Sequence, residues 1–98
     1  MDLSIKFLLQ SVKVITEKKY HLQDLYLIYD FLISVKKDEL IKYLKSNTVL
    51  SYGNDLELYI ETIDHLIKIF EDLENYEECI ELKKKVDECK QLINEKTL

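Results

Sequence analysis

Residues 54–93 read NDLELYIETIDHLIKIFEDLENYEECIELKKKVDECKQLI, and this stretch decides the fold class. Its apolar residues recur every three or four positions, which is the spacing of one face of an α-helix. The recurrence forms two stripes with one break between them. The first stripe is Leu56, Tyr59, Ile63, Leu66, Phe70 and Leu73, and the second is Cys79, Leu82, Val86, Cys89 and Ile93. The stretch therefore predicts two helices.

Each of these helices has its own start signal. Asn54 is followed three residues later by Glu57, and Asn75 by Glu78. An asparagine just before a helix accepts a hydrogen bond from a backbone N–H of the first turn, and a glutamate three residues on returns one. The second signal comes directly after the first stripe, so the connection is very short and the helices must lie antiparallel. We expect a helical hairpin over residues 54–96.

The N-terminal half, residues 1–47, predicts at least two further helices. One apolar stripe is Ile5, Leu8, Val12 and Ile15, and the next is Leu22, Leu25, Tyr29 and Leu32. Residues 25–33 contain one charged group, Asp30, so this helix is expected to be central in the bundle or to face a partner. Near residues 36–38 the pattern stutters, which indicates a kink or a short turn. We expect one all-α domain spanning residues 1–98, a bundle of four helices or of five if that turn forms.

Composition supports a packed helical domain. Apolar residues make up 47% of the chain, which excludes the low-hydrophobicity class of disordered proteins. There is no proline, and the one glycine is Gly53. Alanine and arginine are absent as well, and the joint scarcity of residues with GC-rich codons indicates an AT-rich genome, such as that of a low-GC bacterium or its phage.

No targeting or membrane segment is predicted. The N-terminal apolar run is interrupted by Lys6 and Gln10, and no small-residue cleavage site follows it. The most apolar stretch, residues 25–35, is shorter than the ~20 residues of a membrane span. Cys79 and Cys89, if both lie on one helix, are about 15 Å apart, beyond the ~7 Å of a disulfide. We expect buried thiols in a reducing, cytoplasmic protein.

Catalytic and cofactor chemistry is not expected. The chain has two histidines, His21 and His65, in different predicted helices. His65 lies four residues after Glu61, but zinc and di-iron sites need three or more clustered ligands. One glycine excludes a glycine-rich phosphate loop. We therefore predict no enzyme, no metal and no cofactor.

Charge is unevenly distributed. Residues 1–53 carry 8 lysines and 6 acids, a net charge of +2, and residues 54–98 carry 6 lysines and 13 acids, a net charge of −7. The absence of arginine and the negative total argue against nucleic-acid binding. The acids gather around the hairpin turn, where they predict contact with a basic protein, although a merely solvated face is the competing interpretation. The candidate partner-binding acids are Glu71, Asp72, Glu74, Glu77, Glu78 and Glu81.

Tyrosine is frequent, with 7 residues. A tyrosine buries its ring but needs a polar partner or water for its hydroxyl, so tyrosines are common both at interfaces and at the rim of a small core. Tyr26 and Tyr29, on the apolar second helix, are added to the candidate partner-binding residues. Tyr43, Tyr52 and Tyr59 are expected at wet edges in the same way.

Residues 66–90 resemble known helical hairpins. The pattern Phe70-Glu71-x-Leu73-Glu74-x-Tyr76-Glu77-x-Cys79-x-Glu81-Leu82-Lys83 is similar to the UVR hairpin of excision-repair proteins and some protease adaptors. Residues 75–81 are equally similar to the turn and second-helix opening of a tetratricopeptide unit. The paired alanines and Arg-Asp step of UVR hairpins are missing. Both families are protein-interaction modules, so the resemblance implies binding rather than chemistry.

The leading functional hypothesis is therefore a regulatory protein, an adaptor or a phage-type inhibitor, that binds a basic partner protein through an acidic helical surface. A structural subunit that forms homo-oligomers through its second helix is the alternative from a different class. A bundle that binds a small ligand in a cavity is the third.

Overall fold

The structure is a computed structural model that describes residues 3–47 and 53–97. These residues form five helices and no strand. The helices are α1 (Leu3–Thr16), α2 (Leu22–Ser34), α3 (Lys37–Lys45), α4 (Asp55–Asp72) and α5 (Tyr76–Thr97). The all-α prediction is confirmed. The stutter near residues 36–38 is a short turn, because Val35 and Lys36 are extended before α3 begins.

The helix starts follow the sequence signals. Asn54 is extended, and its side-chain oxygen accepts a hydrogen bond from the backbone N–H of Glu57 at 2.9 Å. Gly53 before it has a φ of +79°, a left-handed conformation that glycine adopts without strain and that other residues rarely adopt. The α5 helix begins directly after Asn75, as expected.

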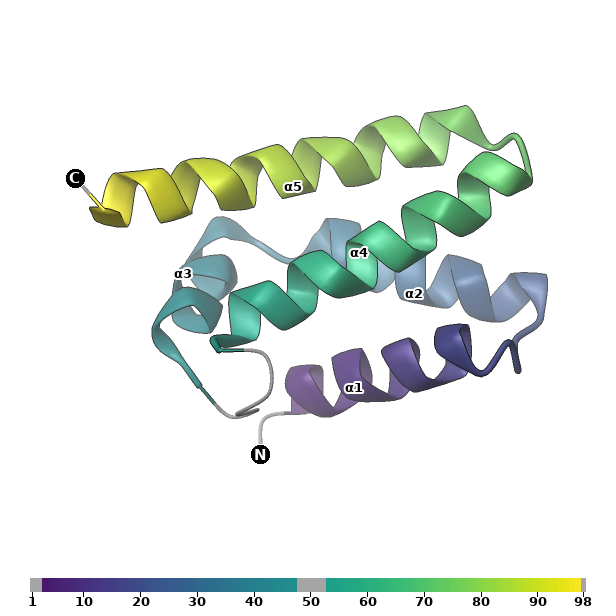
Figure 1. Ribbon diagram of the computed structural model, residues 1–98, viewed down its shortest axis with the longest axis horizontal. Helices are drawn as coiled ribbons and strands as arrows, with labels where there is room; N and C mark the ends of the chain where they lie inside the picture. The colour runs from purple at the N-terminus through teal and green to yellow at the C-terminus, as the bar shows by residue number, and fades with distance from the viewer. Residues whose placement is uncertain (1–2, 48–52, 98) are drawn as a thin grey trace.

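The α4 helix is the centre of the bundle. It contacts each of the other four helices, and Figure 1 shows it crossing the middle of the molecule between α5 and α1. Its fully buried side chains include Leu58 and Ile63. The expectation that the second helix would be central is therefore wrong. In α2 the buried residues are Leu25, Ile28 and Leu32, and Leu22 and Leu27 are more than half exposed.

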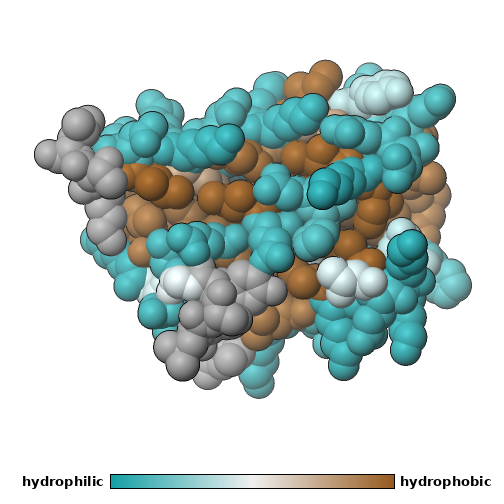
Figure 2. Space-filling view, in the orientation of Figure 1, coloured by the Kyte–Doolittle hydropathy of each residue, from teal (hydrophilic) through white to brown (hydrophobic). Residues whose placement is uncertain are grey.

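The core runs along the length of the bundle. Both cysteines of α5 are buried in it, as the stripe predicted, and neither is in a disulfide. Figure 2 shows hydrophilic residues in rows along the outer faces of the helices, with apolar residues visible in the furrows between them. None of the helices in the described ranges combines the length and the apolar character of a membrane span.

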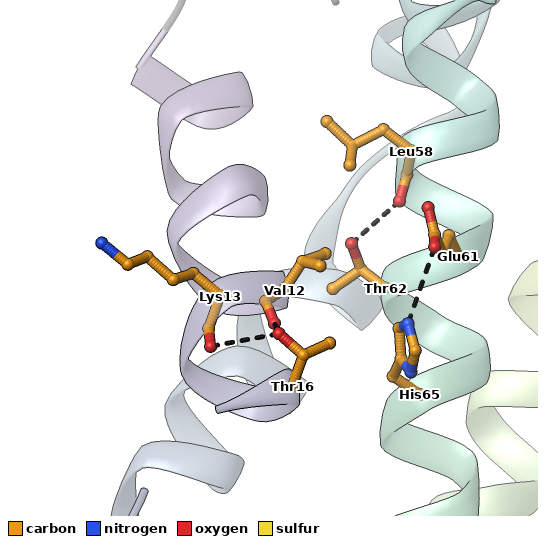
Figure 3. Close-up of polar contacts among 7 residues, drawn as sticks. All are labelled: Val12, Lys13, Thr16, Leu58, Glu61, Thr62 and His65. Atoms are coloured by element: carbon orange, nitrogen blue, oxygen red, sulfur yellow. Dashed lines mark hydrogen bonds and ion pairs between the residues drawn. The ribbon is translucent and has the colours of Figure 1, made fainter. Parts of the chain in front are cut away.

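A buried serine and a buried threonine lie in the α1 and α4 layers of this core. Ser11 of α1 donates to the Phe7 carbonyl at 2.7 Å, and Thr62 of α4 donates to the Leu58 carbonyl at 2.8 Å. Figure 3 shows Thr62 projecting from α4 toward α1 and Val12 projecting from α1 toward α4. Because each hydroxyl is satisfied within its own helix, it is buried without an unpaired polar atom.

Candidate partner-binding surface

The turn between α4 and α5 has a fixed geometry. Glu74 adopts a left-handed conformation with a φ of 61°. Its N–H donates to the Glu71 carbonyl at 3.0 Å, and the N–H of Asn75 donates to the Phe70 carbonyl at 2.8 Å. This pair of bonds is the Schellman motif, which satisfies the last carbonyls of a helix and reverses the chain. The hairpin turn is therefore well defined.

The α2 helix braces this turn. The side-chain amide of Asn75 donates to the Tyr26 hydroxyl at 3.1 Å. The rings of Tyr26 and Tyr29 lie 5.3 and 5.8 Å from the ring of Phe70, which is fully buried. Both tyrosines are half-buried. Their rings contribute to the packing between α2 and the hairpin, and the fold brings them to the same end of the molecule as the hairpin turn.

The six predicted acids surround the turn, and we call them the acidic tip. Five of these acids are exposed, and Glu78 is half-buried. Residues 71–82 contain these six acids and no lysine. The acidic tip consists of Glu71, Asp72, Glu74, Glu77, Glu78 and Glu81. Sequence reasoning thus identified a group of side chains that the fold keeps together.

Most of this charge is not neutralised. Glu71 lies 3.6 Å from the ammonium of Lys83, and Glu81 lies 3.1 Å from that of Lys84, and all four side chains are largely exposed. Exposed ion pairs of this kind contribute about 0–1 kcal/mol. The other four acids form no ion pair with any residue in the described ranges. They are Asp72, Glu74, Glu77 and Glu78. The tip therefore presents a negative field to solvent.

Tyr29 is electrostatically part of the acidic tip. Burial, and then the nearby carboxylates of Glu78 and Glu81, raise the pKa of its hydroxyl above the usual value. Tyr29 also lines a surface hollow of about 270 Å³ together with Glu77 and Ile80. The hydroxyl keeps its proton at neutral pH, so it can donate a hydrogen bond beside carboxylates that can only accept one.

Sequence reasoning missed the exposed apolar residues of this end. Leu73 is 47% exposed, Tyr76 60% and Ile80 53%. Leu73 was expected in the first stripe, but α4 ends at Asp72 and the chain turns before Leu73 reaches the core. Tyr76 and Ile80 lie four residues apart and so share a helix face, and this face is not the one that carries the stripe from Cys79 onward. This difference in position could have predicted their exposure.

The residues considered for metal binding or nucleophilic catalysis do not come together as a site within the described part of the chain. His65 lies 3.7 Å from the carboxylate of Glu61 on one face of α4, as Figure 3 shows. Within the described residues, no three His, Cys, Asp or Glu side chains gather to hold a metal ion. Burial raises the pKa of the Cys79 thiol, and it raises that of Cys89 to about 12. A thiol with a raised pKa is a poor nucleophile at neutral pH.

Comparison of the chain with models of known protein families, with curated proteins and with solved structures finds no match. The resemblance of residues 66–90 to UVR and tetratricopeptide hairpins stays a prediction. The surface around the hairpin turn must therefore be interpreted from its own geometry.

Proposed function

We propose that this protein is a non-catalytic cytoplasmic regulator that binds a partner protein with a basic surface through the acidic tip. One observation carries the proposal: residues 71–82 hold six acids and no lysine, gathered around one well-defined turn. Concentrated charge of one sign attracts and orients an oppositely charged surface during encounter. An adaptor, or an inhibitor that covers a basic site, is the form of regulator that this charge supports.

The test is capture of partners from a low-GC bacterial lysate with the tagged full chain, followed by binding kinetics on the captured protein. The test variant carries Glu74→Lys, Glu77→Lys and Glu78→Lys. A matched control carries Asp64→Lys, Asp87→Lys and Glu95→Lys, which are exposed acids of α4 and α5 outside the tip. Both variants change the net charge equally.

We expect the tip variant to slow association on the order of tenfold and the control to slow it much less. The wild-type association rate should also fall between low and physiological salt, because exposed charges are screened beyond about 8–10 Å. Equal rates for the two variants, or a rate indifferent to salt, would refute the acidic tip as the binding surface.

Self-association through α2 is a second candidate, and a specific observation favours it. Leu22 is 57% exposed and Leu27 is 58% exposed. Leu27 also lines a mostly apolar groove of about 200 Å³ between α1 and α2, with Phe7 and Val14. Sedimentation velocity distinguishes the two cases. An oligomer that Leu27→Lys converts to folded monomer supports this function, and a wild-type monomer at all concentrations excludes it.

The groove between α1 and α2 is smaller than the ~300–1,000 Å³ of typical ligand pockets, so it does not favour a small-molecule ligand.

A further inference from the structure

Three exposed apolar residues, which we call the tip ridge, lie within the stretch of sequence that carries the acidic tip: Leu73, Tyr76 and Ile80. Single exposed apolar residues are common on protein surfaces and need no explanation. Here three large ones, each between 47% and 60% exposed, fall within an eight-residue segment. Tyr76 and Ile80 are one helical turn apart on α5 and so share a face. The first two turns of α5 thus carry a helix face with no helix packed against it.

Ile80 forms the crest of this ridge. On one side it lines the hollow that holds Tyr29, Glu77 and Glu81. On the other side it lines a hollow of about 450 Å³ walled by Glu71, Asp72 and Lys83, in which Lys83 pairs with Glu71. Figure 2 shows an apolar group standing out along the upper edge of α5 near the hairpin turn, with hydrophilic atoms around it. An apolar crest therefore lies between an acidic depression and a second one in which Asp72 is the acid without an ion pair among the described residues.

The ridge is held in place before any partner arrives. The Schellman motif closes the turn below it, the Asn75 amide is bonded to Tyr26, and Cys79 anchors the same stretch of α5 in the core. A surface that does not have to be ordered on binding loses less conformational entropy. The ridge is suited to docking for this reason.

We propose that the acidic tip receives a basic amphipathic α-helix of the partner, whose apolar side packs on the tip ridge while its Lys or Arg side chains reach the acids on either side. This inference rests on the proposed function. The acids favour a partner with basic side chains. Exposed Ile80 favours a partner that also has aliphatic side chains beside those charges. Lysine and arginine meet both demands, because their long stems cover apolar surface while their charged ends reach outward. A helix is favoured over a strand because the described residues offer no sheet edge to extend.

The test uses the full chain and three synthetic peptides of equal length, with binding measured by fluorescence anisotropy. The first peptide arranges Lys and Leu as a basic amphipathic helix. The second has the same composition in an order that spreads Leu around the helix. The third replaces Lys by Glu in the first. We expect the first to bind about tenfold more tightly than the second, and the third not to bind.

Two variants locate the site. Ile80→Gln should remove the about tenfold preference for the first peptide and leave the melting temperature nearly unchanged, because Ile80 is already exposed. Leu22→Gln, which alters an equally exposed leucine on α2, should keep the preference.

The outcomes separate the two proposals. If both basic peptides bind alike, or Ile80→Gln keeps the preference, the ridge inference is overturned while charge-driven binding stands. If no basic peptide binds, or the acidic peptide binds as well as the basic one, the proposed function falls and the inference with it. A large drop in melting temperature for Ile80→Gln would assign the residue to the core and also overturn the inference.

Discussion

Two of the tyrosines expected at wet edges, Tyr43 and Tyr59, are buried, so that expectation is wrong for both. Tyr59 has no exposed surface, and its hydroxyl donates to the backbone carbonyl of Leu32 in the last turn of α2. The last carbonyls of a helix lack partners within the helix, so an outside donor is needed where that end is buried. Tyr43, 3% exposed, packs its ring 5.9 Å from that of Tyr59. The remaining member of that expectation, Tyr52, lies outside the described residues. The hydroxyl of Tyr59 on α4 thus satisfies a carbonyl at the C-terminal end of α2.

We predict that Tyr59→Phe destabilises the protein by about 1–3 kcal/mol, because the Leu32 carbonyl loses its buried donor. For a domain of this size that lowers the melting temperature by roughly 4–8 °C per kcal/mol. Thermal unfolding followed by circular dichroism measures the change. Tyr76→Phe, at a residue 60% exposed, is the control and should have almost no effect. Equal effects of the two changes would contradict this role of the buried hydroxyl.

The buried Cys89 thiol makes stability depend on alkaline pH. Burial, and secondarily Glu88, raise its pKa from 9.0 to about 12, so the folded state retains a proton that the unfolded state releases near pH 9. Stability from this group is complete below pH 9 and is lost as pH rises toward 12. We expect the free energy of unfolding to fall across that window in denaturant titrations. Cys89→Val should make the fall less steep between pH 9 and 10, although buried Cys79 and Tyr59, whose pKa values are also raised, still contribute to it, and an unchanged slope would assign the loss to those other groups.

At the scale of the element, carbonyl groups at and just after the C-terminal end of α2 accept hydrogen bonds from side chains of other helices. Val35, just after α2, accepts a hydrogen bond from the ammonium of Lys85 at 2.8 Å, and Lys85 also lies 3.5 Å from Glu88. Lys85 comes from α5, 50 residues further along the chain. The short turn between α2 and α3 has no glycine or proline to define it. Its geometry therefore depends on donors that the tertiary fold brings to it.

Lys85→Met keeps the length and apolar stem of the side chain but removes the donor. We expect a loss of about 1–3 kcal/mol and faster hydrogen exchange of α3 amides, since the turn before α3 loses its anchor. Lys84→Met changes the neighbouring, largely exposed lysine and should leave both measurements nearly unchanged. If α3 exchange is the same in both variants, Lys85 does not hold the turn.

Two helices end without the glycine that usually fits there. Lys18 after α1 and Glu74 after α4 have φ values of 57° and 61°. A non-glycine residue in this left-handed region is strained by roughly 1 kcal/mol. The α1 end has the same Schellman pair, with Lys18 bonded to Ile15 and Lys19 to Val14. The fold therefore retains strain at both turns.

We predict that Lys18→Gly raises stability by about 1 kcal/mol, measured as a higher melting temperature. Lys19→Gly, one residue on and outside the positive-φ region, should instead be neutral or lower stability, because glycine adds freedom to the unfolded chain there. A higher melting temperature for both would mean that relief of strain at Lys18 is not the cause.

At the scale of the whole molecule, the central position of α4 couples the helices. Every other helix contacts α4, so each of them loses part of its packed surface if α4 unfolds. We expect a single cooperative transition in urea, with helix content by circular dichroism and tyrosine fluorescence changing together. Fluorescence that changes at a lower urea concentration than helix content would show that α2 or the hairpin separates first.

Local periodicity was sufficient to predict much of the fold. The hairpin, its start after Asn54, the five-helix option and the burial of both cysteines all follow from apolar spacing and from capping signals, which act over a few residues. The six acids of the acidic tip are close in sequence, so any helical hairpin keeps them together, and their role in partner binding stays a prediction.

Only the tertiary structure decided which helix is central and what lies beside the tip. Periodicity tells which side of a helix is buried, but the number of neighbours depends on how the helices connect and pack. For that reason the apolar sequence of α2 predicts a helix that is central or that faces a partner, whereas the central helix is α4. The approach of Tyr29 to the acidic tip and the reach of Lys85 to Val35 join residues about 50 positions apart. The exposure of Leu73 depends on where α4 stops relative to the core, which the stripe it continues does not specify.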